Sequence, residues 1–273
     1  MILGLSHIAL GTDDIAGASA RLERLGYGLR FDEPALENHP DKADFLDHYQ
    51  PRHHIRALAA EGAMAIELLD HGALGTEQSA ALIPVLRGPA PLADWTPVAA
   101  AELPLAPEAW PALERALDAR PRAFHDPVLK LTFLWLDSTQ APGLHACVLP
   151  HDADAAPADL LAALRFRADP ARGLWSLLTP LPALQARLIP LPRRPAPGWA
   201  VVPRLDQRGC ACLALMARGT GAALPPAALP PALATALRGS SRSFSLTVAH
   251  KPCRITMALP GQGPFVELVE PQT

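Results

Sequence analysis

Two stretches decide the fold: LSHIALGTDD at residues 5–14 and AIELLDHG at residues 65–72. In a strand, side chains alternate between the two faces. The first stretch therefore places Ile8 on one face and His7 on the other, and the second turns Glu67 away from its apolar neighbours. Each predicted strand offers one metal-capable side chain on the face opposite its apolar one. We expect these two side chains to share a divalent-metal site on a curved sheet.

Composition excludes several classes of protein. The chain has 273 residues, of which 49% are hydrophobic and 19% charged, so it can bury a sizeable core. Its net charge of −3 argues against a nucleic-acid partner. No apolar run reaches the roughly 18 residues that cross a bilayer, and the first residues lack the basic leader of a signal peptide. The four cysteines form no C-x-x-C pair. We expect a soluble, cytoplasmic protein without a membrane partner.

The order β-α-β-β-β is predicted for residues 1–73 and recurs along the chain. In module one the predicted elements are a strand at Ile2–Gly11, a helix that Thr12, Asp13 and Asp14 can cap and that ends at Gly26, and strands at Tyr27–Phe31, in HHIRALAAEG and at Ala63–Leu69. In module two, residues 97–150, they are a strand at Val98–Leu105, a helix at Glu108–Ala119, and strands at Leu129–Leu136 and Leu144–Leu149.

The second half of the chain repeats the pattern less clearly. In residues 157–205, strands are predicted at Leu174–Thr179 and Trp199–Val202 around a helix at Leu184–Leu188. The fourth module is predicted to contain a strand at Cys210–Met216, a helix at Ala232–Leu237, and strands at Phe244–His250, Arg254–Leu259 and Phe265–Val269. We predict two domains: residues 1–152, with modules one and two and the candidate site, and residues 157–273, with two degenerate modules.

The repeat, the opening LSHIALGTDDIAGASARLERLGYGL, and the strand endings IELLDHG and VELVEP resemble the vicinal oxygen chelate superfamily. This superfamily includes glyoxalase I, type I extradiol dioxygenases and bleomycin-resistance proteins. The resemblance implies an α+β fold in which βαβββ modules pair into cup-shaped mixed sheets. It also implies metal ligands on the first and fourth strands of the modules, facing the cup.

Carried over by position, the resemblance makes His7 and Glu67 the first-strand and fourth-strand ligands of module one. In module two, Glu102 aligns with His7, and His145 faces the cup from the fourth strand. Glu267 matches the fourth-strand ligand of module four, but the strands LWSLLT and CACLALM offer it no His or carboxylate partner. Two imidazoles and two carboxylates suit Fe, Mn, Ni or Zn. Alternatively, His7 is a hydrogen-bonded cup residue and Glu102 a surface carboxylate.

His54 and Glu102 are the candidate catalytic groups. An imidazole beside a metal can act as a general base, and His53, His54 and His71 flank the site in sequence. Alternation lets only one of the adjacent His53 and His54 face the cup, and solvated loop-edge histidines are the alternative. The sequence contains no G-x-S-x-G elbow, phosphate loop or dinucleotide fingerprint.

The resemblance implies a glyoxalase-like or dioxygenase-like metalloenzyme. It would act on a small oxygenated molecule by isomerase, lyase or dioxygenase chemistry. A metal-free, drug-sequestering protein of the bleomycin-resistance type is the alternative, with the five tryptophans as candidate lining of an apolar groove. Because paired modules can assemble across subunits, a homodimer is a further expectation.

Overall fold

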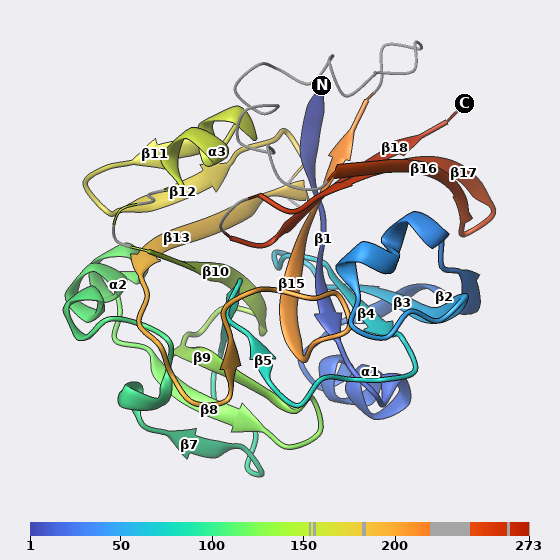
Figure 1. Cartoon of the computed structure of the whole chain (residues 1–273). Helices are drawn as coiled ribbons and strands as arrows, with labels where there is room; N and C mark the ends of the chain where they lie inside the picture. Colours follow the sequence, from blue (N-terminus) through green and yellow to red (C-terminus); the bar gives the residue numbers. More distant parts are fainter. Residues whose placement is uncertain (153, 155–156, 182–183, 219–240, 261–262, 273) are drawn as a thin grey trace.

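A computed structural model describes residues 1–152, 154, 157–181, 184–218, 241–260 and 263–272 (Figure 1). Module one has the expected order, and its bounds are β1 (Ile2–Gly11), α1 (Ile15–Glu23), β2 (Gly28–Glu37), β3 (Arg52–Ala59) and β4 (Ile66–Asp70). A 3-10 helix, η1 (Pro40–Phe45), lies between β2 and β3. As expected, α1 begins after an acidic cap, because the Asp14 carboxylate accepts a hydrogen bond from the Gly17 N–H.

The remaining elements form three further groups and a short link. The second group comprises β6 (Ile83–Gly88), β7 (Thr96–Val98), α2 (Trp110–Leu117), β8 (Arg122–Asp126) and β9 (Leu131–Asp137). The third comprises β10 (Gly143–His151), α3 (Ala158–Ala163), β11 (Arg167–Asp169), β12 (Leu174–Leu177) and β13 (Ala186–Pro192). The fourth comprises β15 (Gly209–Ala217), β16 (Ser241–Val248), β17 (Lys251–Ala258) and β18 (Phe265–Pro271). A two-stranded link joins β5 (Gln78–Ser79) to β14 (Trp199–Ala200).

The strands form two curled mixed sheets of the expected α+β class. The first sheet has the order β16-β17-β18-β15-β1-β4-β3-β2, and the second has the order β11-β12-β13-β10-β6-β9-β8-β7. In each half-sheet the first strand of the group runs parallel to the last. The two halves of each sheet meet at an antiparallel pair, β1 with β15 or β6 with β10.

The pairing of the modules differs from the expected one. The first sheet combines the first and last groups of the chain, and the second sheet combines the two middle groups. Each sheet therefore contains strands from both sides of the predicted 152/157 division. The correction follows from β10, predicted as the last strand of module two. It is the first strand of the third group, because it is parallel to β13 and antiparallel to β6.

Two predicted elements are also corrected. Val98–Leu105 is not a strand: Ala100–Glu102 forms the 3-10 helix η2, and the first strand of the second group is β6. Leu184–Leu188 is not a helix, since β13 begins at Ala186. The predicted helix at Ala232–Leu237 lies outside the described residues.

The main core lies on the face of the first sheet that α1 covers. Ile8 and Leu10 of β1 are buried there against Ile15 and Leu22 of α1. His7 and Ala9 alternate to the opposite face, where Ala9 belongs to a separate apolar cluster. This alternation turns the polar side chains of β1 and β4 away from the helix. In the described part of the chain, no helix is long and apolar enough to span a membrane.

Candidate functional site

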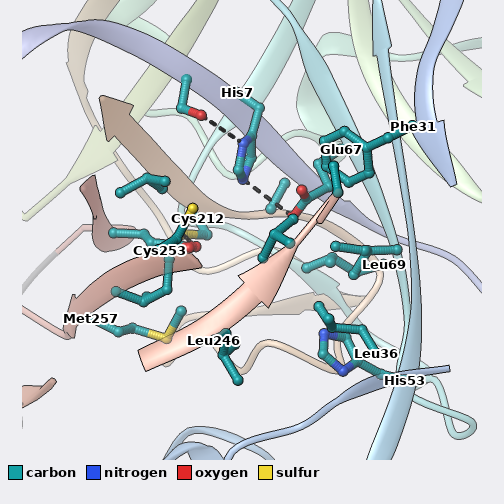
Figure 2. Close-up of a pocket in the computed structure, with 18 of the residues that line it drawn as sticks. His7, Phe31, Leu36, His53, Glu67, Leu69, Cys212, Leu246, Cys253 and Met257 are labelled. Carbon is teal, nitrogen blue, oxygen red and sulfur yellow. Dashed lines mark hydrogen bonds and ion pairs between the residues drawn. The ribbon is translucent and has the colours of Figure 1, made fainter. Parts of the chain in front are cut away.

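A cavity of about 290 Å³ lies on the face of the first sheet that carries His7 (Figure 2). Both halves of the sheet line it, so it draws residues from the two ends of the sequence. Its walls are mostly apolar and include Phe31, Leu36, Ile55, Leu69, Leu246, Val248, Ile255, Met257 and Val269. Its ionisable lining residues are His7, Lys42, His53, Glu67, His71, Lys251, Glu267 and the thiols of Cys212 and Cys253. An apolar pocket with a few convergent polar groups is typical of a small-molecule site.

His7 and Glu67 converge in this cavity, as predicted. Their strands run parallel, and Ala9, two residues after His7, is opposite Glu67. His7 Nε2 lies 3.2 Å from Glu67 Oε1, while Ser6 Oγ lies 3.2 Å from His7 Nδ1. Burial opposes charge on both side chains, but their mutual attraction outweighs it, which raises the pKa of His7 and lowers that of Glu67. Each side chain therefore favours the charged form of the other.

The strand register places a second, related pair beside the first. On β15, Ala214 is opposite Glu267 of β18, as Ala9 is opposite Glu67. Cys212 precedes Ala214 by two residues and therefore occupies the position on β15 that His7 occupies on β1. Cys212 Sγ lies 3.9 Å from Glu267 Oε2. Each pair thus combines a carboxylate with one further side chain, the imidazole of His7 in the first group and the thiol of Cys212 in the last.

Glu267 and Cys212 favour their neutral forms. Burial raises the pKa of Glu267, and the carboxylate of Glu67 adds to this, although His7 and Lys42 oppose it. Burial also raises the pKa of the Cys212 thiol, reinforced by the carboxylates of Glu267 and Glu67. The ionised carboxylate of Glu67 therefore lies near a second carboxyl group, Glu267, that binds a proton more readily, and near the thiol of Cys212.

A histidine pair and a lysine border the same cavity. The rings of His53 and His71 stack with their centroids 4.9 Å apart. Burial and the Lys42 charge lower the pKa of His53 to about 2 and that of His71 to about 4, so both imidazoles are neutral. His53 Nδ1 and both ring nitrogens of His71 are buried and have no hydrogen-bond partner in the described structure. Lys42 is 8% exposed, and its ammonium lies 5.6 Å from the centre of the Phe244 ring.

Three sequence-predicted residues lie elsewhere. His54 Nε2 is 2.6 Å from Asp32 Oδ1 and does not line the cavity; its neighbour His53 does. Glu102 is exposed at the end of η2, where it accepts a hydrogen bond from the Ala99 N–H. His145 belongs to the second sheet, since β10 pairs with β6 and β13. The expected set of His7, Glu67, His145 and Glu102 is therefore not one cluster, whereas Glu267 does join His7 and Glu67.

Sequence reasoning missed Cys212 and Lys42. The signal for Cys212 was the match between HIAL at residues 7–10 and CLAL at residues 212–215, which aligns the thiol with the imidazole. Lys42 lies in a polar stretch, and only the packing of η1 shows that its side chain is buried.

The cavity residues suit a borderline divalent ion by their chemistry. Imidazole, carboxylate and thiolate are the ligands of Zn²⁺ and its neighbours. His7 Nε2 is buried and makes no aligned hydrogen bond. Its distance from Glu67 Oε1 is close to the roughly 3.4 Å that separates two ligands of one tetrahedral ion. Within the described residues, no three His, Cys, Asp or Glu side chains are grouped so that they could hold an ion as they stand.

Comparisons with known proteins identify the fold. No family model matches the sequence, and no curated protein matches it. Among solved structures, glyoxalase I from Zea mays has a TM-score of 0.57 at 11% identity, covering 98% of this chain and 92% of that one. A protein of Bacillus subtilis subsp. subtilis str. 168, described as a candidate dioxygenase, has a TM-score of 0.52 at 11% identity, covering 100% of this chain and 86% of that one.

These similarities extend over nearly the whole length of each chain. The chain has the fold of glyoxalase I and of this candidate dioxygenase. The expected resemblance is therefore confirmed at the level of the fold.

Proposed function

We propose that this protein is a metal-dependent enzyme of the vicinal oxygen chelate type that acts on a small oxygenated molecule in the first-sheet cavity. The observation that carries the proposal is the convergence of His7, Glu67 and Glu267 in one buried pocket, with Cys212 at the position on β15 that corresponds to His7 on β1. Two solved structures with a similar fold are glyoxalase I and the candidate dioxygenase, and this similarity favours an enzyme.

His7, Glu67 and Glu267 are the proposed ligands, with Cys212 as the fourth. When bound, a divalent ion would act as a Lewis acid on adjacent substrate oxygens. A cation also favours the ionised forms of Glu267 and Cys212, whose protons burial otherwise retains. Binding of the metal ion therefore releases protons, and the affinity for the ion should increase as pH rises.

The other lining residues bind and orient the substrate. The apolar walls exclude water, which strengthens every polar interaction inside. The neutral His53 and His71 present unpartnered ring nitrogens that can accept or donate a hydrogen bond at substrate oxygens. Lys42 supplies the positive charge that favours an acidic substrate group or a developing oxyanion.

The metal-free binding protein is less well supported. A pocket selected only for apolar ligands gains nothing from burying an imidazole and two carboxylates, because each desolvated charge costs free energy. The ionisable groups at the base of this cavity therefore favour chemistry over sequestration.

Metal titration tests the proposal. Protein stripped with a chelator is titrated with Zn²⁺, Mn²⁺, Ni²⁺ and Fe²⁺ by calorimetry, and one tight site per chain is expected. His7→Ala and Glu67→Gln should weaken it about 100-fold or more, whereas Glu102→Gln, which removes an exposed carboxylate, is the matched control. In Co²⁺-loaded protein, Cys212→Ser should remove the sulfur-to-metal absorption band.

Turnover is tested on compounds that carry two adjacent oxygens. Oxygen consumption separates dioxygenation from isomerisation or lyase chemistry. A wild-type protein that binds no ion, or a His7→Ala variant that binds it equally well, contradicts the proposal. Tight ligand binding without turnover and without sensitivity to chelators would instead support the sequestering protein.

A further inference from the structure

Three arginines gather on one face of the second sheet, away from the proposed metal site. Arg87 comes from β6, Arg187 from β13, and Arg172 from the turn between β11 and β12. They line a cavity of about 330 Å³ together with His145 and the C-terminal end of α2. None of these four residues lines the first-sheet cavity.

Among the described residues, the guanidinium groups of this cluster are not paired with carboxylates, although Asp169 accepts a hydrogen bond from the backbone N–H of Arg172 at 3.2 Å. In the described part of the chain, none of the three guanidinium groups has a carboxylate within ion-pair distance. Asp137 also borders the cavity, but its Oδ1 accepts hydrogen bonds from Arg122 at 2.7 Å and from the Trp135 indole at 3.0 Å. Asp118 borders it as an exposed residue. The carbonyl end of α2 contributes only a partial negative charge.

His145 holds two of the arginines side by side. Its Nδ1 accepts hydrogen bonds from Arg87 Nη1 and Arg187 Nη1, each at 3.1 Å. An imidazole that accepts at Nδ1 is neutral, and burial together with the arginine charges lowers the pKa of His145 to about 4. Arg87 Nη2 donates to the Gly62 carbonyl at 3.0 Å, while its buried Nε has no hydrogen-bond partner.

The half-buried guanidinium groups of Arg87 and Arg187 repel each other, and the neutral imidazole of His145 between them carries no charge to offset this. Their proximity is therefore unfavourable unless an anion binds to both. We propose that Arg87, Arg187 and Arg172 form a second binding site, which takes the phosphate group of a small molecule. Planar guanidinium forks match phosphate oxygens and bind them in pairs. A phosphate dianion balances two of the three positive charges, whereas a single carboxylate balances one. The cavity volume leaves room for an organic group as well.

Calorimetric titration of the whole chain with inorganic phosphate, against chloride of equal ionic strength, tests this site. One saturable site per chain is expected. Arg187→Gln and Arg87→Gln should each weaken it at least about tenfold, and Arg187→Lys should retain part of the affinity because it keeps the charge but not the fork. Arg120→Gln, which removes an 89% exposed arginine, is the matched control.

A thermal melt without phosphate separates binding from folding. Without phosphate, Arg187→Gln should melt at or above the wild-type temperature, because the substitution relieves the repulsion between Arg87 and Arg187. With phosphate added, only the wild type should gain stability. Several outcomes overturn the proposal: no saturable binding, equal binding by the arginine variants, or binding lost only in Lys42→Met, which would place phosphate in the first cavity. Binding of succinate but not of phosphate also overturns it. Loss of metal binding at His7 leaves this test unaffected.

Discussion

His7 Nε2 and Glu67 Oε1 lie 3.2 Å apart, with each side chain only 11% exposed. The two residues are far apart in sequence and adjacent in space because β1 and β4 run parallel in the first sheet. A buried ion pair of this kind is costly to break, since removal of one member leaves the other charged without a partner.

A double-mutant cycle measures the free energy of interaction between His7 and Glu67. In metal-free protein, His7→Asn and Glu67→Gln should each lower the free energy of unfolding by about 3–5 kcal/mol. The double variant should lose clearly less than the sum, because neither charge is then left alone. Urea unfolding at neutral pH provides the measurement. Additivity to within about 0.5 kcal/mol would show that the two side chains do not interact.

Replacement of Glu267 by Gln should stabilise the metal-free protein at high pH. Burial raises the folded-state pKa of this carboxyl group above its ordinary value of 4.5. Its contribution is therefore fully present below pH 4.5 and is lost as pH rises through the folded-state pKa. Glu267→Gln keeps the shape and removes the titration, so its advantage over the wild type in urea unfolding should grow as pH rises from 4.5 to the folded-state pKa and stay constant above it. A constant difference across that range contradicts the raised pKa.

The stacked histidines predict a loss of stability in mild acid. The folded-state pKa values of His53 and His71, about 2 and about 4, lie below the ordinary value of 6.5. Their contribution is complete above pH 6.5 and is lost as pH falls below it, because the unfolded chain takes up protons first. Each group adds a slope of up to about 1.4 kcal/mol per pH unit.

Chemical unfolding at several pH values between 7.5 and 4.5 checks this expectation. His71→Asn should remove the contribution of one histidine to the slope of the free energy of unfolding against pH. His250→Asn, at an exposed position between β16 and β17, should leave this slope unchanged. Equal slopes in His71→Asn and the wild type would rule out His71 as a source of the acid sensitivity.

Tyr27 connects the two sheets through one buried hydroxyl. Its O–H donates to the Met64 carbonyl at 3.0 Å and accepts from the Leu144 N–H at 2.9 Å. Tyr27→Phe should lower the free energy of unfolding by about 1–3 kcal/mol, since both backbone groups lose a partner in the core. Tyr49→Phe is the comparison, because the Tyr49 hydroxyl bonds the Asn38 carbonyl in a partly exposed setting and water can replace it. Equal costs for the two variants would contradict the role given to Tyr27.

The parts of the fold with strong local signals could be predicted from the sequence. Alternation identified β1 and β4, and the Asp14 cap identified the start of α1. The first strand of the second group was missed because Pro84 lies within it, which weakens a strand signal; in the structure Pro84 lies opposite Cys147. The apolar stretch at 98–105 was mistaken for that strand, although Leu103 and Leu105 are buried without forming one there.

The site was predictable only in part. His7 and Glu67 come from one module, so their convergence follows from local β-α-β-β-β order. The addition of Glu267 depends on β1 pairing with β15, a long-range contact that no local pattern specifies. The same missing contact explains why His145 and Glu102 were placed in the wrong cluster.

The pairing of β1 with β15 also affects synthesis of the protein. Ribosomes release the first module long before Phe265–Pro271, so the apolar residues around His7 stay uncovered until β15 and β18 have emerged. The middle sheet can close on its own during this interval. The half-sheet of β1 to β4 is therefore exposed to aggregation during synthesis, and binding of chaperones to the nascent chain should be greatest just before β18 is made.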